Sequence, residues 1–147
     1  TEIYTLSLHD ALPISKNLAL FDLEEQRYSG FWGRQFSPYY PVREPALKIP
    51  VYSKDTQKAD MQVLMDDIVL YQTTLDLNKG IQYPEYNLAF SESVLDAYSA
   101  AINKDKKEDD QEEIKPADNG KYYLRAGKYQ VILKSGTDEV KKTFTIK

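Results

Sequence analysis

The chain has 147 residues, of which 41% are hydrophobic and 29% charged, with a formal net charge of -4 and no cysteine. This length and composition are typical of one globular domain with its own core. Without cysteine, disulfides, thiolate catalysis and cysteine-bound zinc are excluded. The acidic balance argues against nucleic-acid binding, and no apolar run approaches the roughly 20 residues of a membrane-spanning helix.

Residues 1–15 differ in character from the rest. The run from Glu2 to Ile14 resembles the translation of a short-read sequencing adapter. We therefore expect residues 1–15 to be an artefactual extension, to be set aside like a processing segment, and the natural protein to extend further upstream. The alternative is a genuine amphipathic segment. The only histidine, His9, lies in this run and is given no functional role.

Residues 16–45 are predicted to be a connecting segment. Its first part, residues 16–27, fits either a short helix or a strand through Leu18, Leu20 and Asp22. In residues 30–45, which we call the aromatic loop, two glycines and three prolines exclude a continuous helix or strand. Four aromatic residues there are candidates for a surface that stacks on sugars or docks on a partner: Phe31, Trp32, Tyr39 and Tyr40. Alternatively, they cover the open end of the domain or its seam with a preceding domain.

A β-sandwich is predicted over residues 46–147. Apolar alternation and turn signals about every ten residues give four strands in its first half. These strands cover residues 46–52, 59–65, 68–77 and 81–90. Because proline cannot donate to a strand ladder, Pro50 predicts that the first strand lies at a sheet edge, and Pro84 predicts a bulge or kink in the fourth.

The chain then leaves the strand pattern. Apolar side chains at helical spacing after Ser91 predict a short helix over about residues 92–104. Nine of the ten residues 104–113 are charged. Their spacing fits no calcium-binding loop, so we expect a solvated loop (residues 104–115), and residues 114–119 are expected to return to the sheet.

The C-terminal residues carry the clearest strand signal. Tyr129, Val131 and Leu133 alternate with polar residues, and only Ile132 departs from this period of two. A Ser-Gly-Thr-Asp turn follows, and the apolar alternation resumes up to Ile146. With the upstream strands, this hairpin predicts an all-β, antiparallel, immunoglobulin- or fibronectin-like sandwich of about seven strands with one short helical excursion.

No catalytic site is predicted. Glycoside hydrolysis would need two carboxylates roughly 5 to 9 Å apart. The candidate pairs are Asp66 with Asp67, and Glu44 with Glu85. Neighbouring strand residues point to opposite faces, which disfavours the first pair, and acidic residues near turns are mostly solvated. We expect neither an enzyme nor a bound cofactor or metal ion.

Four stretches, taken in their order and spacing, resemble one known family. They are Trp32–Arg34, Arg43–Tyr52, Lys79–Leu88 and Gly120–Val131. Together they resemble the C-terminal region of bacterial sortilin-like, BNR-repeat β-propeller proteins, where an immunoglobulin- or fibronectin-like module follows the propeller. That family has Leu-Pro-Pro-Gly-Thr-Tyr near its end and Gly-Leu-Asn before an earlier strand. This chain differs mildly, with Leu124-Arg-Ala-Gly-Lys-Tyr129 and Gly80-Ile-Gln82.

The resemblance implies a non-catalytic C-terminal accessory module of a secreted or periplasmic protein, with an upstream β-propeller of the same polypeptide as its partner. The aromatic loop would pack against that propeller. The resemblance carries no catalytic residue onto this chain, because an active site of that family would lie on the propeller. The alternative is a carbohydrate- or peptide-binding sandwich, in which exposed and coplanar loop aromatics would hold the ligand.

Overall fold

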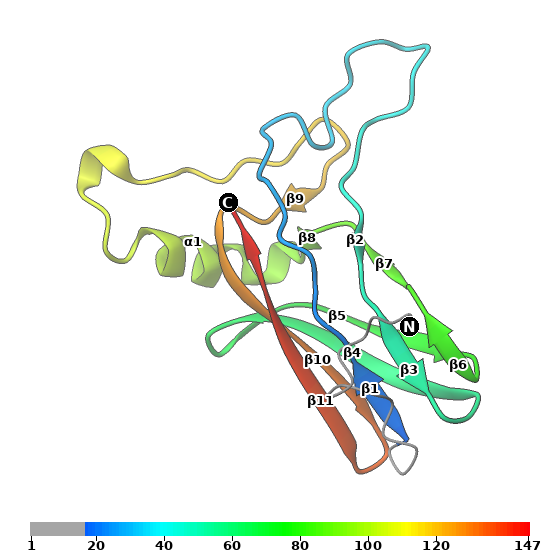
Figure 1. Cartoon of the computed structure of the whole chain (residues 1–147). Coiled ribbons are helices and arrows are strands. Elements are labelled where there is room, and N and C mark those ends of the chain that lie inside the picture. Colours follow the sequence, from blue (N-terminus) through cyan, green and yellow to red (C-terminus); the bar gives the residue numbers. More distant parts are fainter. Residues whose placement is uncertain (1–16) are drawn as a thin grey trace.

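The computed structural model describes residues 17–147, so the expectation for residues 1–15, His9 included, lies outside the described residues. Two antiparallel sheets pack against one another around a single hydrophobic core (Figure 1). One sheet has the order β1 (Leu18–Leu20), β3 (Val51–Ser53), β6 (Gly80–Gln82). The other has the order β11 (Asp138–Ile146), β10 (Gly127–Ser135), β4 (Gln57–Met65), β5 (Ile68–Leu77). The predicted all-β antiparallel sandwich is confirmed.

The order of these strands is that of an immunoglobulin- or fibronectin-like fold. Of the seven strands in these two sheets, the first, second and fifth in chain order (β1, β3 and β6) form one sheet. The other four (β4, β5, β10 and β11) form the second. The chain therefore crosses between sheets instead of completing one before the other. Two short pairs extend the sheets: β2 (Leu47–Lys48) with β7 (Glu85–Tyr86), and β8 (Ala89–Phe90) with β9 (Tyr122–Tyr123).

The two long hairpins form where the sequence predicts them. β4 leads into β5 through Asp66, whose φ of 52° is the left-handed conformation that a tight turn requires. β10 and β11 pair along their whole length, and the alternating residues Tyr129, Val131 and Leu133 are all buried. The residue that departs from the alternation, Ile132, is buried as well.

An irregularity in the β4–β5 ladder provides a hydrogen-bond acceptor for Ser91, where the chain leaves the sheet and begins its helical segment. The register shifts between Val63 and Leu64, and Leu70 of β5 is left without a ladder partner. A β-bulge of this kind releases a backbone group from the sheet. The carbonyl of Leu70 accepts a hydrogen bond from the Ser91 amide at 2.9 Å, which fastens the start of the excursion to the edge of β5.

The prediction that the strand around Pro50 lies at a sheet edge is wrong. β3 pairs with β1 on one side and with β6 on the other. Pro50 lies in the gap between β2 and β3, where its missing N–H interrupts no ladder bond. Its carbonyl accepts a hydrogen bond from the Phe21 amide at 3.0 Å. The predicted strand is therefore broken in two, and its second half, β3, is central in its sheet, whereas β2 pairs with β7 alone.

Of the two alternatives predicted at Pro84, the bulge is wrong, and the strand is interrupted there, between β6 (Gly80–Gln82) and β7 (Glu85–Tyr86). The β3–β6 pairs and the β2–β7 pairs share one register, so the ladder continues in step across the proline. Ile81 and Tyr83 consequently face outward and are exposed. The buried residues are the even-numbered ones that follow: Tyr86, Leu88 and Phe90. Because Ile81 and Tyr83 are apolar although they face outward, the sequence pattern was interpreted as a shift of the alternation at Pro84.

The sandwich begins earlier than predicted. β1 lies in the expected connecting segment and pairs with β3, which confirms the strand alternative and corrects the boundary at residue 46. Gln26 then forms a parallel bridge with Ile146, and its amide donates to the Thr145 carbonyl at 2.9 Å. The residues from β1 to this bridge are therefore part of the fold.

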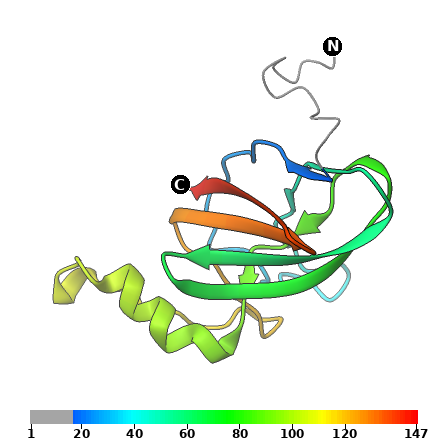
Figure 2. The same ribbon diagram turned by 90° about the horizontal axis from the view of Figure 1, so that it is seen from below.

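The predicted helix is present and lies across one end of the sandwich (Figure 2). The hydroxyl of Ser91 accepts from the Ser93 amide and caps a short 3-10 turn, η2 (Glu92–Val94). This turn leads into α1 (Leu95–Asn103), whose Tyr98 is buried in the core. The turn η2 is thus held at its start by the Ser91 cap, and α1 is held along its length by the buried Tyr98.

The charged residues 104–113 are all exposed and include a short 3-10 turn, η3 (Glu108–Asp110). The loop is closed at its base because the side-chain amide of Asn103 donates to the Glu112 carbonyl at 2.9 Å and accepts from the Glu112 amide at 2.8 Å. Residues 114–119 form no strand, which corrects the prediction that they return to the sheet.

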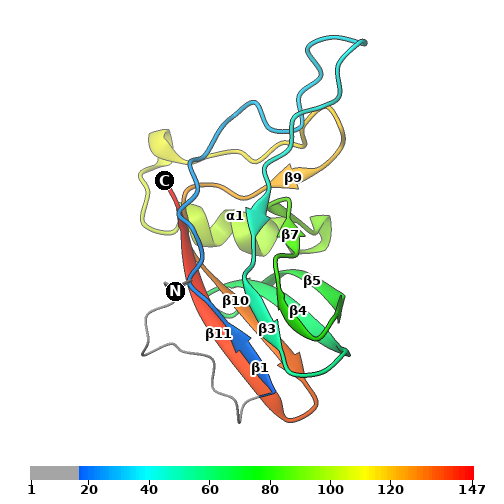
Figure 3. The ribbon, with the colours of Figure 1, turned by 45° about the vertical axis from the view of Figure 1, so that its right-hand side comes forward.

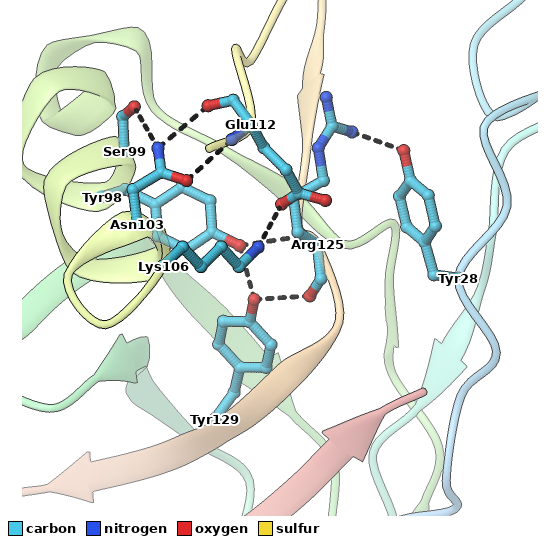
Figure 4. A network of polar contacts seen from close by, with 8 residues as sticks. All are labelled: Tyr28, Tyr98, Ser99, Asn103, Lys106, Glu112, Arg125 and Tyr129. Carbon is cyan, nitrogen blue, oxygen red and sulfur yellow. Dashed lines mark hydrogen bonds and ion pairs between the residues drawn. The ribbon is translucent and has the colours of Figure 1, made fainter. Parts of the chain in front are cut away.

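A buried network of tyrosines joins α1 to β10 (Figure 4). The Tyr129 hydroxyl donates to the Arg125 carbonyl at 2.6 Å, and the Arg125 amide donates to the Tyr98 hydroxyl at 2.8 Å. Since the single proton of Tyr129 is used on Arg125, Tyr98 donates to Tyr129 and closes a ring of three hydrogen bonds. A tyrosine that bonds the backbone just upstream of this strand is the tyrosine corner of immunoglobulin-like sandwiches. Burial raises the pKa of Tyr129 and of Tyr98, so both remain neutral.

Candidate interaction surface

The aromatic loop projects beyond the ends of both sheets (Figures 1 and 3). Three of the four candidate residues are exposed on it: Phe31 by 55%, Tyr39 by 88% and Tyr40 by 74%. Phe36, which the sequence analysis did not single out, is 71% exposed and lies 5.7 Å from Phe31 between ring centroids. The structure therefore gathers aromatic side chains on one protruding loop, as the density of aromatic residues between prolines had indicated.

Trp32 is not part of this surface, which corrects its assignment to the candidate set. Its side chain is 6% exposed and belongs to the core cluster. The indole packs edge-on against Tyr28, with ring centroids 5.4 Å apart, and lies 6.1 Å from the ring of Tyr123. Trp32 anchors the base of the loop in the domain and leaves Phe31 on the outside.

Gly33 fixes the stem of the loop. Its amide donates to the Arg43 carbonyl at 2.8 Å, which ties the outgoing strand of the loop to the returning one. Its carbonyl accepts from the Asn119 amide at 3.1 Å, and the neighbouring Gln35 amide donates to the Asp118 carboxylate at 2.8 Å. The stem is thus bound to the turn that precedes β9.

The tip of the loop is also held by hydrogen bonds. The side-chain amide of Gln35 donates to the carbonyls of Ser37 and Tyr40, the second at 3.1 Å. The hydroxyl of Ser37 accepts from the Tyr39 amide at 3.2 Å. Together with the fixed φ of the loop prolines, these bonds restrict the backbone that carries the exposed rings.

An ion pair lies where the loop returns to the sandwich. The carboxylate of Glu44 accepts from the Lys121 ammonium at 2.8 Å and from the Tyr123 hydroxyl at 2.6 Å. These two donors lower the pKa of Glu44, and the Lys121 bond has the larger effect. Burial, with Glu44 as its acceptor, raises the pKa of Tyr123 to about 12.

The lowered pKa of Glu44 predicts a loss of stability in acid. Its ionised form is favoured by folding, so its contribution is present above the usual pKa of 4.5 and is lost as the pH falls through the lower folded value. We expect Glu44→Gln to remove this part of the pH dependence. Urea denaturation over a pH series measures it, and equal acid dependence in both proteins would contradict the expectation.

The charges between Phe31 and Arg43 are positive. From Phe31 to Arg43 the ionisable side chains other than tyrosine are Arg34 and Arg43, although the whole chain carries a net charge of -4. The guanidinium of Arg34 lies over the Phe31 ring, 6.0 Å from its centroid. The surface is therefore aromatic and cationic, a combination that is enriched in protein–protein interfaces.

The candidate carboxylate pairs do not gather around the loop aromatics. Asp66 and Asp67 form the exposed β4–β5 turn, and Glu44 is engaged by Lys121. Glu85 lies on β7 with its side chain exposed. Within residues 17–147, no three histidine, aspartate or glutamate side chains come together as metal ligands do.

Comparison of the chain with protein-family models, with curated proteins and with solved structures gives no match. Among the described residues, no helix has the length and apolarity needed to cross a membrane.

Proposed function

We propose that this domain is a non-catalytic interaction module that docks its aromatic loop on another domain of the same polypeptide. The resemblance to sortilin-like proteins suggests an upstream β-propeller as that domain and a secreted or periplasmic setting. The observation that carries the proposal is the protruding loop, on which Phe31, Phe36, Tyr39 and Tyr40 are more than half exposed. Exposed aromatic clusters on a folded domain mark surfaces that a partner covers.

The restricted backbone of the loop supports the same function. Docking a mobile loop loses conformational entropy, whereas a loop already held in its bound shape loses little. Gln35 spans the tip, and Gly33 ties the stem to the turn before β9. The domain therefore presents its aromatic rings on a scaffold that is ordered before any partner binds.

The ring geometry favours a protein partner over a sugar for this surface. A sugar platform needs rings that share a plane, whereas the planes of Phe31 and Phe36 are inclined by 57°. Rings at an angle fit separate pockets on a protein surface, and Arg34 beside them offers a charged contact at the rim. A peptide or carbohydrate ligand on this loop is the second candidate.

The partner can be obtained from the gene itself. Long-read sequencing across the 5′ side identifies the domain encoded upstream, and that domain is then expressed separately and titrated with this chain by calorimetry. We expect saturable binding that Tyr39→Ser/Tyr40→Ser weakens by about tenfold or more, because exposed aromatic anchors dominate such interfaces.

The matched control is Tyr83→Ser. Tyr83 is 60% exposed and lies between β6 and β7, outside the aromatic loop, so its loss should leave the affinity unchanged. Unfolding of both variants by urea should resemble that of the parent. A reading frame without an upstream domain, or equal affinity for the loop variant and the parent, would contradict the proposal.

A further inference from the structure

A second candidate site lies away from the aromatic loop tip, in a groove of about 680 Å³ beside the edge of β5. One wall is β5 from Val69 to Gln72, and the other is the chain from Asn87 to the helical turn η2. The volume falls in the range of about 300 to 1,000 Å³ that is common for sites of small ligands.

Two backbone irregularities shape the walls of this groove. The β-bulge at Leu70 lies in one wall and turns its carbonyl toward Ser91 in the other. Leu88, between the lining residues Asn87 and Ala89, has a φ of 61°, which a leucine rarely adopts. Bulges and strained residues concentrate at functional sites, and here two of them, far apart in sequence, border one groove.

The lining combines an aromatic ring with neutral polar groups. Tyr71 is half-buried, and its ring stacks on Tyr86 with centroids 4.9 Å apart and planes inclined by 27°. Gln72 is exposed, and its amide makes no side-chain hydrogen bond within residues 17–147. The hydroxyls of Ser91 and Ser93 lie 2.8 Å apart at the same groove. These polar groups can form hydrogen bonds to the hydroxyls of a ligand, while the Tyr71 ring and the lining residues Val69 and Val94 contact an apolar face of the same ligand.

The charge of the groove is balanced. Lys121 is the charged residue in its lining, and its ammonium is paired with Glu44 at 2.8 Å. An anionic ligand would have to compete with this carboxylate. An added peptide strand is disfavoured at the bulge, because the Leu70 carbonyl is already bonded to the Ser91 amide.

We propose that this groove binds a neutral oligosaccharide, with one sugar unit against Tyr71 and the hydroxyls of neighbouring units bonded to Gln72 and Ser93, because Tyr71 and Gln72 are consecutive in β5 and point to opposite faces of the sheet. A sugar has the matching chemistry, an apolar ring face bordered by neutral hydroxyl groups. The proposal rests on residues outside the aromatic loop and does not depend on the docking function of that loop.

The test is NMR titration of the isotope-labelled 147-residue chain with neutral oligosaccharides of glucose, xylose, mannose, galactose and N-acetylglucosamine. We expect one of them to give saturable shifts at the amides of Gln72, Ala89 and Ser93. The double variant Gln72→Ala/Ser93→Ala loses two hydrogen-bonding side chains at exposed positions, so it should fold normally and bind about tenfold more weakly.

Tyr39→Ser/Tyr40→Ser is the matched control and should bind the sugar with unchanged affinity. This control separates the two proposals, because it weakens docking of the loop and leaves the groove intact. Absence of shifts with every sugar at millimolar concentration would overturn the proposal. Shifts confined to the aromatic loop, or full affinity in the Gln72→Ala/Ser93→Ala variant, would overturn it as well.

Discussion

Replacing Gly33 by alanine is expected to lower the free energy of unfolding by about 2 to 4 kcal/mol. Gly33 has a φ of 74°, where a residue with a Cβ is strained. An added Cβ would also lie 2.6 Å from the Ala117 Cβ and from a ring carbon of Tyr123, so the stem and the turn before β9 could not both keep their positions. Urea denaturation followed by tryptophan fluorescence measures the change, because Trp32 is the adjacent residue.

Gly30→Ala is the matched control three residues earlier. No atom lies within 4 Å of the Cβ position of Gly30, and the residue is exposed. Its substitution should change the free energy of unfolding by less than about 1 kcal/mol. If Gly33→Ala were as stable as Gly30→Ala, the stem would not be held by the contacts described above.

Replacing Tyr129 by phenylalanine is expected to cost about 1 to 3 kcal/mol of stability. The change removes one oxygen and keeps the ring, which stacks on Phe144 with centroids 5.4 Å apart. It opens the ring of hydrogen bonds, leaves the buried Tyr98 hydroxyl without its acceptor and releases the Arg125 carbonyl. The helix α1 and β10 then lose their shared polar link.

Tyr122→Phe is the control for this variant. Tyr122 lies on β9 against Phe90, and its hydroxyl makes no hydrogen bond among residues 17–147. Loss of that hydroxyl should be nearly neutral. Equal unfolding free energies for the two variants would show that the tyrosine corner contributes nothing beyond its packing.

The elements that the sequence predicted best depend on local alternation and turn chemistry. β4 and β10 carry apolar residues at every second position, β11 keeps this spacing at Val140, Phe144 and Ile146, and Asp66 adopts the left-handed turn that its residue type favours. The helix was predictable for the same reason, from the Ser91 cap and the helical spacing of Tyr98. These patterns depend on residues that are close together in the sequence, so they can be recognised without knowing the fold.

The wrong predictions concern residues whose pairing or burial depends on segments that are distant in the sequence. Pro50 and Pro84 were read as edge and bulge signals, but each falls at a position where the ladder needs no N–H from it. Trp32 was assigned to the surface with Phe31, but its indole packs against Tyr28 and against Tyr123 of β9, a contact with a segment distant in the sequence. The local sequence alone could not show that Trp32 is buried and that its neighbour Phe31 is exposed.

The central claim is that the aromatic loop is covered by another domain in the intact gene product. Hydroxyl-radical footprinting tests it directly by comparing oxidation rates in that product and in the 147-residue chain. We predict slower oxidation of Tyr39 and Tyr40 in the intact product and an unchanged rate at Tyr83. Equal rates at Tyr39 and Tyr40 in both proteins would contradict the claim.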